Sequence, residues 1–325
     1  MFTRRATLAA LLAAPAIIPF RAHAQGGFPD QPVKMIIPFP PGGPADQVGR
    51  IVGKVMGEKL GKPVVIDSRS GAGGVIGVDA VAKSKPDGHT IGLASTGALA
   101  ILPHLQPNMP YDPLKDLAPV GLVISVPQVA VVSPKLGVND LKGLVARAKA
   151  KPGDISYGSA GIGSSLHLAA ELFRLRAGIN IVHVPYRGAA PAVTDLLGGQ
   201  IQLILADLPV VLPHIRAGSL KALGVTAKTR AELLPDVPTF EEQGFAGVIS
   251  DTWYGVIAPT GVPADRIATL SNALSASLAD GETKRLLREQ AGTIADLGPD
   301  GFASHIREQS RIWGEVVRAA NIKLE

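Results

Sequence analysis

The sequence contains no cysteine and few aromatic residues, and both scarcities limit what the protein can be. Without cysteine the chain cannot form disulfides, so its stability must come from a hydrophobic core. Aromatic residues make up only 4% of the 325 residues, which leaves little for the stacking platforms that hold single-stranded nucleic acid. Hydrophobic residues reach 46% and charged residues 18%, which is typical of one large or two medium globular domains rather than of a disordered chain.

The first 24 residues are predicted to be a signal peptide. They combine a basic start at Arg4 and Arg5 with an apolar stretch over 8–20 and the tripeptide AHA, which ends at Ala24. The small outer residues of that tripeptide fit a signal-peptidase site, so cleavage after Ala24 would make Gln25 the first mature residue. The apolar stretch is too short to span a bilayer comfortably and contains two prolines, which argues against a membrane anchor. The paired arginines leave both the general and the twin-arginine export routes open.

Removal of this segment changes the charge of the chain. The full sequence has 32 basic and 27 acidic residues and a formal net charge of +5. The predicted signal peptide holds three of the arginines and no acidic residue, so the mature chain keeps 29 basic against 27 acidic residues, a net charge of +2. No basic stripe remains to release counterions from nucleic acid, and we expect no nucleic-acid partner. No later segment is long and apolar enough to cross a membrane, so we expect a soluble protein outside the cytoplasm.

Short apolar segments alternate with amphipathic ones along the mature chain. This order is typical of α/β folds with parallel strands. The predicted strands are 33–38, 64–67, 90–94, 129–132, 155–158, 180–184, 203–206, 221–225 and 253–257, and the predicted helices are 45–60, 74–83, 137–149, 164–176, 189–197, 264–279 and 301–320. Two similar α/β units closed by C-terminal helices predict two lobes with a ligand cleft between them. We expect lobe 1 to comprise 25–124 plus 252–325 and lobe 2 to comprise 125–251.

Four loops rich in glycine or hydroxyl residues follow predicted strands. They are PFPPGGPAD (38–46), SRSGAGGVIG (68–77), STGALA (95–100) and GSAGIGSS (158–165). A helix N-terminus presents unpaired N–H groups and about half a positive charge, and glycine lets a ligand approach that backbone closely. Loops of this kind aimed into one cleft predict an anion site that needs neither arginine nor metal.

These loops do not match the known nucleotide-binding patterns. A Walker A loop needs a lysine and a hydroxyl residue after its last glycine, whereas Gly43 is followed by Pro44. The dinucleotide pattern G-x-G-x-x-G needs a third glycine where this chain has Ile76. Nucleotide binding is therefore not expected.

Catalytic chemistry has little support in the residues. Ser164 and His167 lie three apart on a predicted helix and could touch, which leaves an exported hydrolase as an alternative. The chain has no G-x-S-x-G elbow, and Ser164 is also well placed to cap that helix. Asp46 could act as a general base, but its place in the first helical turn favours a role at the helix dipole. The seven histidines show no metal-ligand spacing, so we expect no catalytic residue, metal or cofactor.

Seven motifs, taken in order, resemble one known family. They are PFPPGG-x-x-D, SGAGGVIG, PHLQPNMPYDPLKDLAPV, GSAGIGSSLHL, VPYRG, DVPTFEEQG and TWYGVIAP. They are similar to the motifs of the periplasmic solute receptors of tripartite tricarboxylate transporters, the Bug family. The resemblance covers essentially the whole mature chain.

The resemblance implies a type II periplasmic-binding-protein fold that closes on a small ligand, usually a carboxylate. It also implies a monomer that delivers its ligand to the membrane permease subunits of a tripartite transporter, and a ligand-binding sensor for a signalling partner is the alternative. The implied ligand-binding residues are Phe39, Gly42, Gly43, Asp46, Ser95, Thr96, Ser159, Gly161, Gly163, Ser164, His167, Tyr186 and Asp207. His167, Tyr186 and Asp207 would contact the distal part of the ligand or its waters. Asp207 is equally well explained as an acid that fixes its lobe through backbone bonds.

The sequence departs from the family pattern at Pro44 and Ala45, where the family often has a hydroxyl residue. Proline lacks an N–H and alanine has no side-chain donor. The first loop therefore offers fewer side-chain contacts, which predicts a preference for less polar ligands.

Overall fold

The computed structural model describes residues 27–323, so the predicted signal peptide lies outside the described residues. The strands are β1 (Val33–Ile37), β2 (Val64–Ser68), β3 (Thr90–Ser95), β4 (Leu117–Val132), β5 (Ser156–Ser159), β6 (Val182–Pro185), β7 (Leu203–Asp207), β8 (Lys221–Val225), β9 (Asp251–Pro259) and β10 (Thr293–Leu297). The helices are α1 (Pro44–Leu60), α2 (Val75–Ala82), α3 (Leu141–Ala150), α4 (Ser165–Ala177), α5 (Ala189–Gly198), α6 (Leu208–Arg216), α7 (Ala264–Ala279), α8 (Gly281–Glu289) and α9 (Pro299–Ala320). Short 3₁₀ turns and one π-helical turn, Gly97–Ile101, complete the structure.

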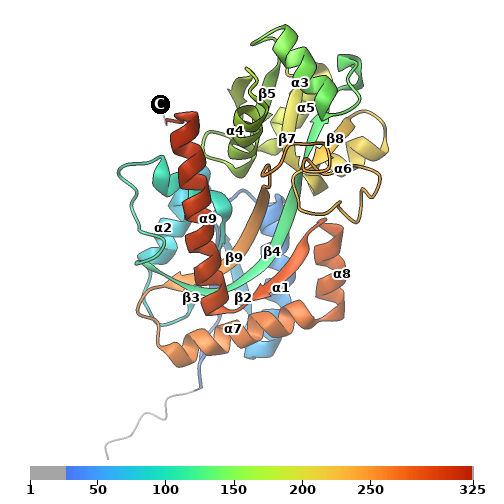
Figure 1. The fold of residues 1–325 in the computed structure, drawn as a ribbon. Coiled ribbons are helices and arrows are strands. Elements are labelled where there is room, and N and C mark those ends of the chain that lie inside the picture. Colours follow the sequence, from blue (N-terminus) through green and yellow to red (C-terminus); the bar gives the residue numbers. More distant parts are fainter. Residues whose placement is uncertain (1–26, 324–325) are drawn as a thin grey trace, which may run out of the picture.

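Lobe 1 is built on strands in the order β2-β1-β3-β9-β4. β1 pairs in parallel with both β2 and β3, as strand–helix alternation requires, because α1 and α2 carry the crossovers between parallel strands. β9 runs antiparallel between β3 and β4, and β10 adds a further antiparallel pairing on β4. α1 packs against α7 and α8, which lie together at the lower side of the molecule in Figure 1.

Lobe 2 continues the strand order as β4-β7-β5-β6. β5 pairs in parallel with β6 and β7, whereas β4 pairs antiparallel with both β7 and β8. Helices α3 to α6 surround these strands in the upper part of Figure 1. The arrangement confirms the predicted α/β fold with two lobes.

The long strand β4 belongs to both lobes. Its residues Leu117–Pro127 pair with β9, whereas Gln128–Val132 pair with β7, and Val129–Val132 also pair with β8. The sequence predicted only 129–132 as strand, because two prolines and a glycine interrupt the apolar pattern before it. The residue limits proposed for the lobes stay a prediction, and the pairing of β4 changes between Pro127 and Gln128.

Four other elements differ clearly from the sequence-based expectation. The helix predicted over 137–149 begins only at Leu141, because Asp140 caps it by accepting a hydrogen bond of 2.7 Å from the Gly143 N–H. α6, α8 and β10 were not predicted at all. α6 was not predicted because it contains two prolines: Pro209 in its first turn, where proline is tolerated, and Pro213 in its interior.

Helix α9 lies along both lobes (Figure 1) and contacts β4, the turn Gly97–Ile101 and α4. Its Phe302 and His305 pack edge-on against the fully buried ring of Trp253 on β9, with ring centroids 5.7 and 5.0 Å apart. These aromatic contacts join the last helix to the strand that crosses between the lobes.

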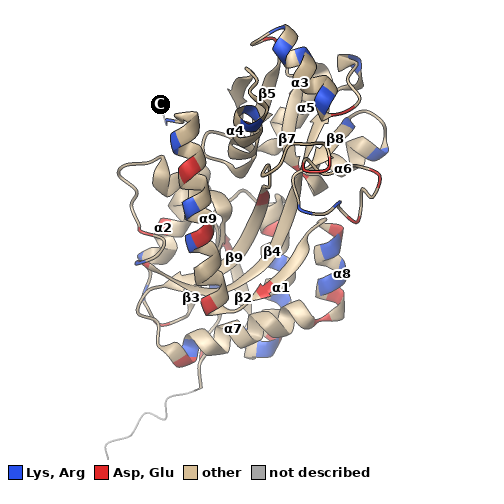
Figure 2. Ribbon diagram, viewed as in Figure 1, with Lys and Arg blue, Asp and Glu red and all other residues tan. Residues whose placement is uncertain are grey.

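Charged residues of both signs alternate along the outer helices α8 and α9 (Figure 2). Arg285 bonds to Glu282 and Glu289, and Arg311 bonds to Glu308 and Glu315, all at helical spacing. Exposed pairs of this kind contribute little stability each, so they mark solvated faces. Across residues 27–323, no helix combines the length and the apolar character that a membrane crossing requires.

Candidate ligand site

The first predicted loop ends at the N-terminus of α1 and is held there by Asp46. The Gly42 N–H and the Arg50 Nε each donate a hydrogen bond of 2.9 Å to Asp46 Oδ2. Gly42 has a positive φ of 83°, a conformation that glycine adopts without the steric cost that other residues meet. The resemblance implies that Gly42 binds the ligand, whereas its N–H is bonded to Asp46. The donors that α1 itself leaves unused are the N–H groups of Gly43, Ala45 and Asp46, because Pro44 has none.

The Asp46 carboxylate is almost completely buried, and its Oδ1 has no partner within the described residues. The Arg50 guanidinium lowers the pKa of this carboxyl, the Gly42 N–H adds to the lowering, and burial opposes it. Asp46 is therefore ionised at neutral pH, and the helix dipole favours that charge as well. One oxygen shapes the loop while the other remains available to a donor.

We expect this ion pair to make stability depend on pH at the acidic end. Because the pKa of Asp46 is lower in the folded than in the unfolded chain, its contribution is complete above the unfolded value of about 3.9 and is lost as the pH falls through the folded value. Arg50→Gln should raise the pKa of Asp46, so the variant should melt below the wild type at neutral pH and the difference should shrink toward pH 2. Melting temperatures over pH 2–7 test this, with Arg69→Gln, which removes the exposed Arg69–Asp67 pair, as the matched control. A constant difference across the range would contradict the assignment.

The loop after β3 is tied to β9 rather than left free. The hydroxyl of Thr96 accepts a hydrogen bond of 2.9 Å from the Trp253 N–H and donates one of 3.5 Å to the Asp251 carbonyl. Thr96 is fully buried and Ser95 nearly so. The backbone of Gly97, where the π-helical turn begins, is thereby held against the strand that connects the lobes. Such π-turns are rare and occur frequently at functional sites.

The loop 159–164 of lobe 2 satisfies most of its own polar groups. Ser159 Oγ accepts from the Gly161 N–H at 3.1 Å and lies 2.7 Å from His183 Nε2. Ser164 Oγ donates to the Gly161 carbonyl at 2.7 Å and accepts the His167 backbone N–H at 3.2 Å, which makes it the N-cap of α4. The hydroxyls predicted to meet a ligand thus shape the loop, and α4 leaves the N–H groups of Ser165 and Leu166 unused.

Two stacked histidines, His167 and His183, bond to this loop and support it. The rings of His167 and His183 lie 4.0 Å apart and nearly parallel, and Tyr157 stacks on His183 at 4.9 Å. The Gly163 N–H donates to His167 Nδ1 at 3.2 Å, which places the ring proton on Nε2. Burial, with the neighbouring His183, lowers the pKa of His167 to about 3, and burial also lowers the pKa of His183. Both rings are neutral near pH 7, and His183 is a supporting residue that sequence reasoning missed.

The contacts of Ser164 and His167 bear directly on the hydrolase alternative. The Ser164 hydroxyl bonds to backbone, and the Nδ1 of His167 is bonded to the Gly163 N–H. A serine nucleophile needs a hydrogen bond from its hydroxyl to a basic imidazole. Within the described residues the two side chains are engaged elsewhere, and no group of three or more histidine, cysteine, aspartate or glutamate residues could hold a metal ion there.

Tyr186 and Asp207 lie in two different settings. The Tyr186 hydroxyl donates to Asp195 Oδ2 at 2.7 Å, so it is engaged with α5, and burial together with Asp195 raises its pKa to about 12. Asp207 ends β7 and is buried, and its Oδ1 accepts a hydrogen bond of 2.6 Å from Thr252 Oγ1. The bond goes to a side chain of β9 rather than to the backbone of its own lobe.

The predicted loops converge on the turn Gly97–Ile101 and the residue after it. A Cβ built on Gly74 would lie 3.5–3.6 Å from the side chains of Phe39 and Ala98, and one built on Gly97 would lie 3.5 Å from the Gly163 carbonyl. Leu102 fills the space beside both Gly73 and Gly163. Loops that are far apart in the sequence therefore surround one short segment; α4 begins directly after the loop that holds Gly163, and α1 begins five residues after Phe39.

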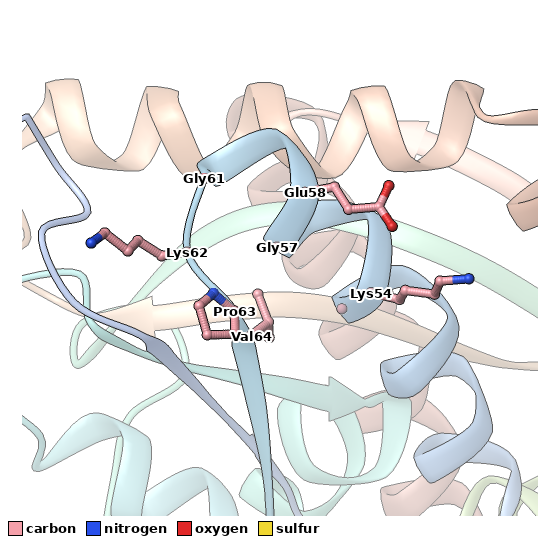
Figure 3. Close-up of a pocket in the computed structure, with 8 residues that line it drawn as sticks. Lys54, Gly57, Glu58, Gly61, Lys62, Pro63 and Val64 are labelled. Atoms are coloured by element: carbon pink, nitrogen blue, oxygen red, sulfur yellow. The ribbon is translucent and has the colours of Figure 1, made fainter.

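Two surface hollows lie apart from the predicted ligand-binding residues, although Leu99 of the turn Gly97–Ile101 lines one of them. One of about 420 Å³ lies at the opposite end of α1 (Figure 3), and Lys54, Glu58, Lys62 and Val64 are among the residues that line it. Another of about 500 Å³ lies between the segment 99–116 and Ser310 of α9. None of the predicted ligand-binding residues lines either hollow, so the site rests on the contacts of its loops.

Comparisons with known proteins agree on one family. The sequence profile described as "Tripartite tricarboxylate transporter family receptor" matches residues 48–322. Protein BugT of Bordetella pertussis is 40% identical over 299 residues, which cover 92% of each chain. A solved periplasmic transporter is 40% identical with a TM-score of 0.85, over 92% of this chain and all of that one.

Two solved proteins of Rhodopseudomonas palustris are similar as well. One, solved with adipate, is 32% identical with a TM-score of 0.85 and covers 91% of this chain and 99% of its own. The other, MatC with bound malate, is 29% identical with a TM-score of 0.82 and covers 89% of this chain and all of its own.

Proposed function

This chain belongs to the tripartite tricarboxylate transporter receptor family, and on that premise we propose that it is a periplasmic receptor that binds a small carboxylate between its lobes and delivers it to a tripartite transporter. The observation that carries the proposal is the convergence of glycine loops around the turn Gly97–Ile101: the loop that opens α4 at Gly163, the loop at Gly74, and Phe39 of the loop that leads into α1. Helix N-termini arranged in this way offer N–H donors and positive potential to an anion without a basic side chain.

The donors in this site are mainly backbone groups. The hydroxyls of Thr96, Ser159 and Ser164 are engaged with their own loops or with β9, so they hold the N–H groups in place. Each charge-assisted hydrogen bond from an N–H to a carboxylate contributes about 1.5–3 kcal/mol. A few such bonds, offset by association costs, correspond to micromolar affinity, roughly −8 kcal/mol.

We propose a dicarboxylate with a largely apolar middle as the ligand. The relatives solved with adipate and malate bind dicarboxylates of different polarity. In this chain Pro44 and Ala45 supply no side-chain donor, and the ring of Phe39 lies against the same loops. These features favour adipate over the hydroxylated malate.

Thermal denaturation tests the receptor proposal directly. Adipate should raise the melting temperature and malate should raise it less, because a ligand that binds only the folded chain stabilises it by about 2.7 kcal/mol at 100 times its dissociation constant. Hexane-1,6-diol, which has the same chain length without carboxylates, serves as the matched control and should have no effect. If neither acid, nor any other carboxylate of a broad panel, shifts the melting temperature, the proposal is wrong. Delivery is tested separately by uptake of the bound acid in cells that carry or lack this chain.

A further inference from the structure

A chain of three buried side chains links the end of β7 to the start of α4 through β9. Asp207 Oδ1 accepts from Thr252 Oγ1 at 2.6 Å, and Thr252 Oγ1 lies 2.7 Å from Ser165 Oγ. All three residues are more than nine-tenths buried. Gln128 of β4 donates a further hydrogen bond of 3.2 Å to Thr252 Oγ1. Asp207 is one of the residues predicted from the sequence to bind the ligand, whereas Thr252 and Ser165 are not.

The protonation state of Asp207 determines the direction of these hydrogen bonds. An ionised carboxylate only accepts, so Thr252 must donate its single hydroxyl proton to Asp207. Thr252 Oγ1 then accepts from both Gln128 and Ser165, and the Ser165 proton points inward along the chain. A protonated Asp207 can donate instead, after which Thr252 donates to Ser165 and the Ser165 proton is released for another acceptor.

Ser165 stands where the anion is proposed to bind. It is the first residue of α4, directly after the capping Ser164, and its backbone N–H is one of the unused helix donors. Thr96 from lobe 1 bonds to the backbone of Asp251 and Trp253 of β9, and Ser165 from lobe 2 bonds to the side chain of Thr252 between them. The hydroxyl of Ser165 thus connects the buried carboxyl to the meeting point of the loops.

The surroundings of Asp207 keep the addition of a proton within reach at neutral pH. Burial raises the pKa of Asp207 to about 6, the bonds from Thr252 and Gln128 lower it, and the nearby Asp251 of β9 raises it. The other titratable group that faces it is Tyr254 of β9, whose own buried hydroxyl is neutral because burial raises its pKa far above 10. Within the described residues no lysine, arginine or histidine forms an ion pair with Asp207. Its side chain makes no capping bond to α6, which begins at the next residue.

We propose that Asp207 takes up one proton when the carboxylate ligand binds, and that the chain through Thr252 then turns the Ser165 hydroxyl outward to donate to that ligand. This inference rests on the proposed function, and it makes the receptor a co-binder of an anion and a proton. The proton moves from solvent to Asp207, and no covalent bond of the protein changes. The same ligand becomes better held because one further donor faces it.

Proton uptake has a defined sign. Binding should be strongest below the pKa of ligand-free Asp207, about 6, where the proton is already present. Above that value the affinity should fall by up to about tenfold per pH unit, because each unit of pKa difference corresponds to a factor of ten. Adipate and malate are fully ionised over pH 6.5–8, so a trend in that range belongs to the protein.

Calorimetric titration with adipate and with malate at pH 7, in two buffers of different ionisation enthalpy, counts the protons taken up. Wild type should take up close to one proton per ligand, and Asp207→Asn, whose amide can donate as the protonated acid does, should take up none and bind with a pH-independent affinity. Asp251→Asn is the matched control, since Asp251 is a neighbouring partly buried carboxyl that bonds to Ser125 rather than to Thr252. It should keep the uptake.

The remaining variants test whether proton uptake depends on the hydrogen-bonded side chains of Asp207, Thr252 and Ser165 or only on repulsion between charges. Ser165→Ala should lose most of the uptake, and full uptake in that variant would show direct repulsion between ligand and Asp207 and overturn the role of the chain. If proton uptake is lost in Asp251→Asn but kept in Asp207→Asn, the proton binds to Asp251 and the proposal is wrong. Binding without uptake in wild type refutes the proton linkage while leaving the receptor function intact.

If neither acid binds, that result counts against the receptor proposal. The proton inference can still be tested by a measurement that needs no ligand. Carbon-13 NMR of the Asp207 carboxyl, assigned by comparison with Asp207→Asn, should show a titration between pH 5 and 7.5. A carboxyl that remains ionised throughout that range overturns the proton linkage, whatever the ligand.

Discussion

Replacement of Trp253 by alanine will destabilise the protein by about 3–5 kcal/mol, the range for large aromatic side chains removed from a packed interior. Trp253 has no exposed surface, and its ring packs edge-on against Phe302 and His305 of α9. Its backbone N–H also anchors Thr96, so movement of β9 around the cavity would disturb the loop after β3. The loss should therefore affect the attachment of α9 and the position of the ligand loops together.

Urea denaturation followed by circular dichroism measures this change. Circular dichroism is preferred to fluorescence, because the substitution removes one of the two tryptophans and so alters the fluorescence signal itself. Trp253→Phe is the matched control. The indole Nε1 of Trp253 is buried without a partner in the described part of the chain, so phenylalanine forfeits volume but no hydrogen bond. We expect the phenylalanine variant to lose less than half as much stability as the alanine variant. Equal losses would show that the edge-on contacts with α9 contribute little.

Replacement of Gly163 by alanine will reduce the affinity for adipate by about tenfold to a hundredfold. Gly163 has a positive φ of 77°, and a Cβ there would lie 2.5 Å from Leu102 Cδ2 and 3.2 Å from Leu105 Cδ1. Overpacking of this kind forces side chains and backbone to shift at a cost of about 1–3 kcal/mol. The shift would separate the loop 159–164 from the turn Gly97–Ile101 and move the α4 donors away from the ligand.

Gly199→Ala separates the two effects of that substitution. Gly199 follows α5 with nearly the same φ, 81°, but no atom lies within 4 Å of a Cβ built there. Both variants carry the strain of a left-handed alanine, about 1 kcal/mol, whereas only Gly163→Ala meets Leu102. Calorimetry should find adipate binding unchanged in Gly199→Ala and weakened in Gly163→Ala. Equal affinities in the two would show that this loop approach does not hold the ligand.

Much of the fold could be predicted from the local pattern of apolar residues. The ranges 221–225 and 264–279 agree with β8 and α7 to the residue, because each is a clean apolar or amphipathic stretch between turn residues. β4 was recognised only over its last four residues. Pro119 in its first part borders a shift of register in the pairing with β9, which no local pattern reveals.

In the candidate site, too, the local features could be predicted from the sequence and the long-range contacts could not. The loops at the N-termini of α1 and α4 were identified from glycine spacing, and Ser164 was recognised as a possible cap, which its bond to the His167 N–H confirms. The bond from Thr96 to Trp253, the stack of His167 on His183 and the chain from Asp207 to Ser165 were not foreseen. Each joins residues separated by 16 to 157 positions, and a polar residue gives no sign of its distant partner.

The sequence by itself determined the alternation of strands and helices, the two glycine loops and the family, because these follow from periodicity and from motifs a few residues long. Only the tertiary structure decided which donors remain for a ligand. Buried polar groups must be paired, and the crossing of β4 and β9 brings the partners of Thr96, Ser165 and Asp207 within hydrogen-bond distance. The hydroxyls that looked like ligand contacts became supports for the loops, and the N–H groups of two helices became the proposed binding surface.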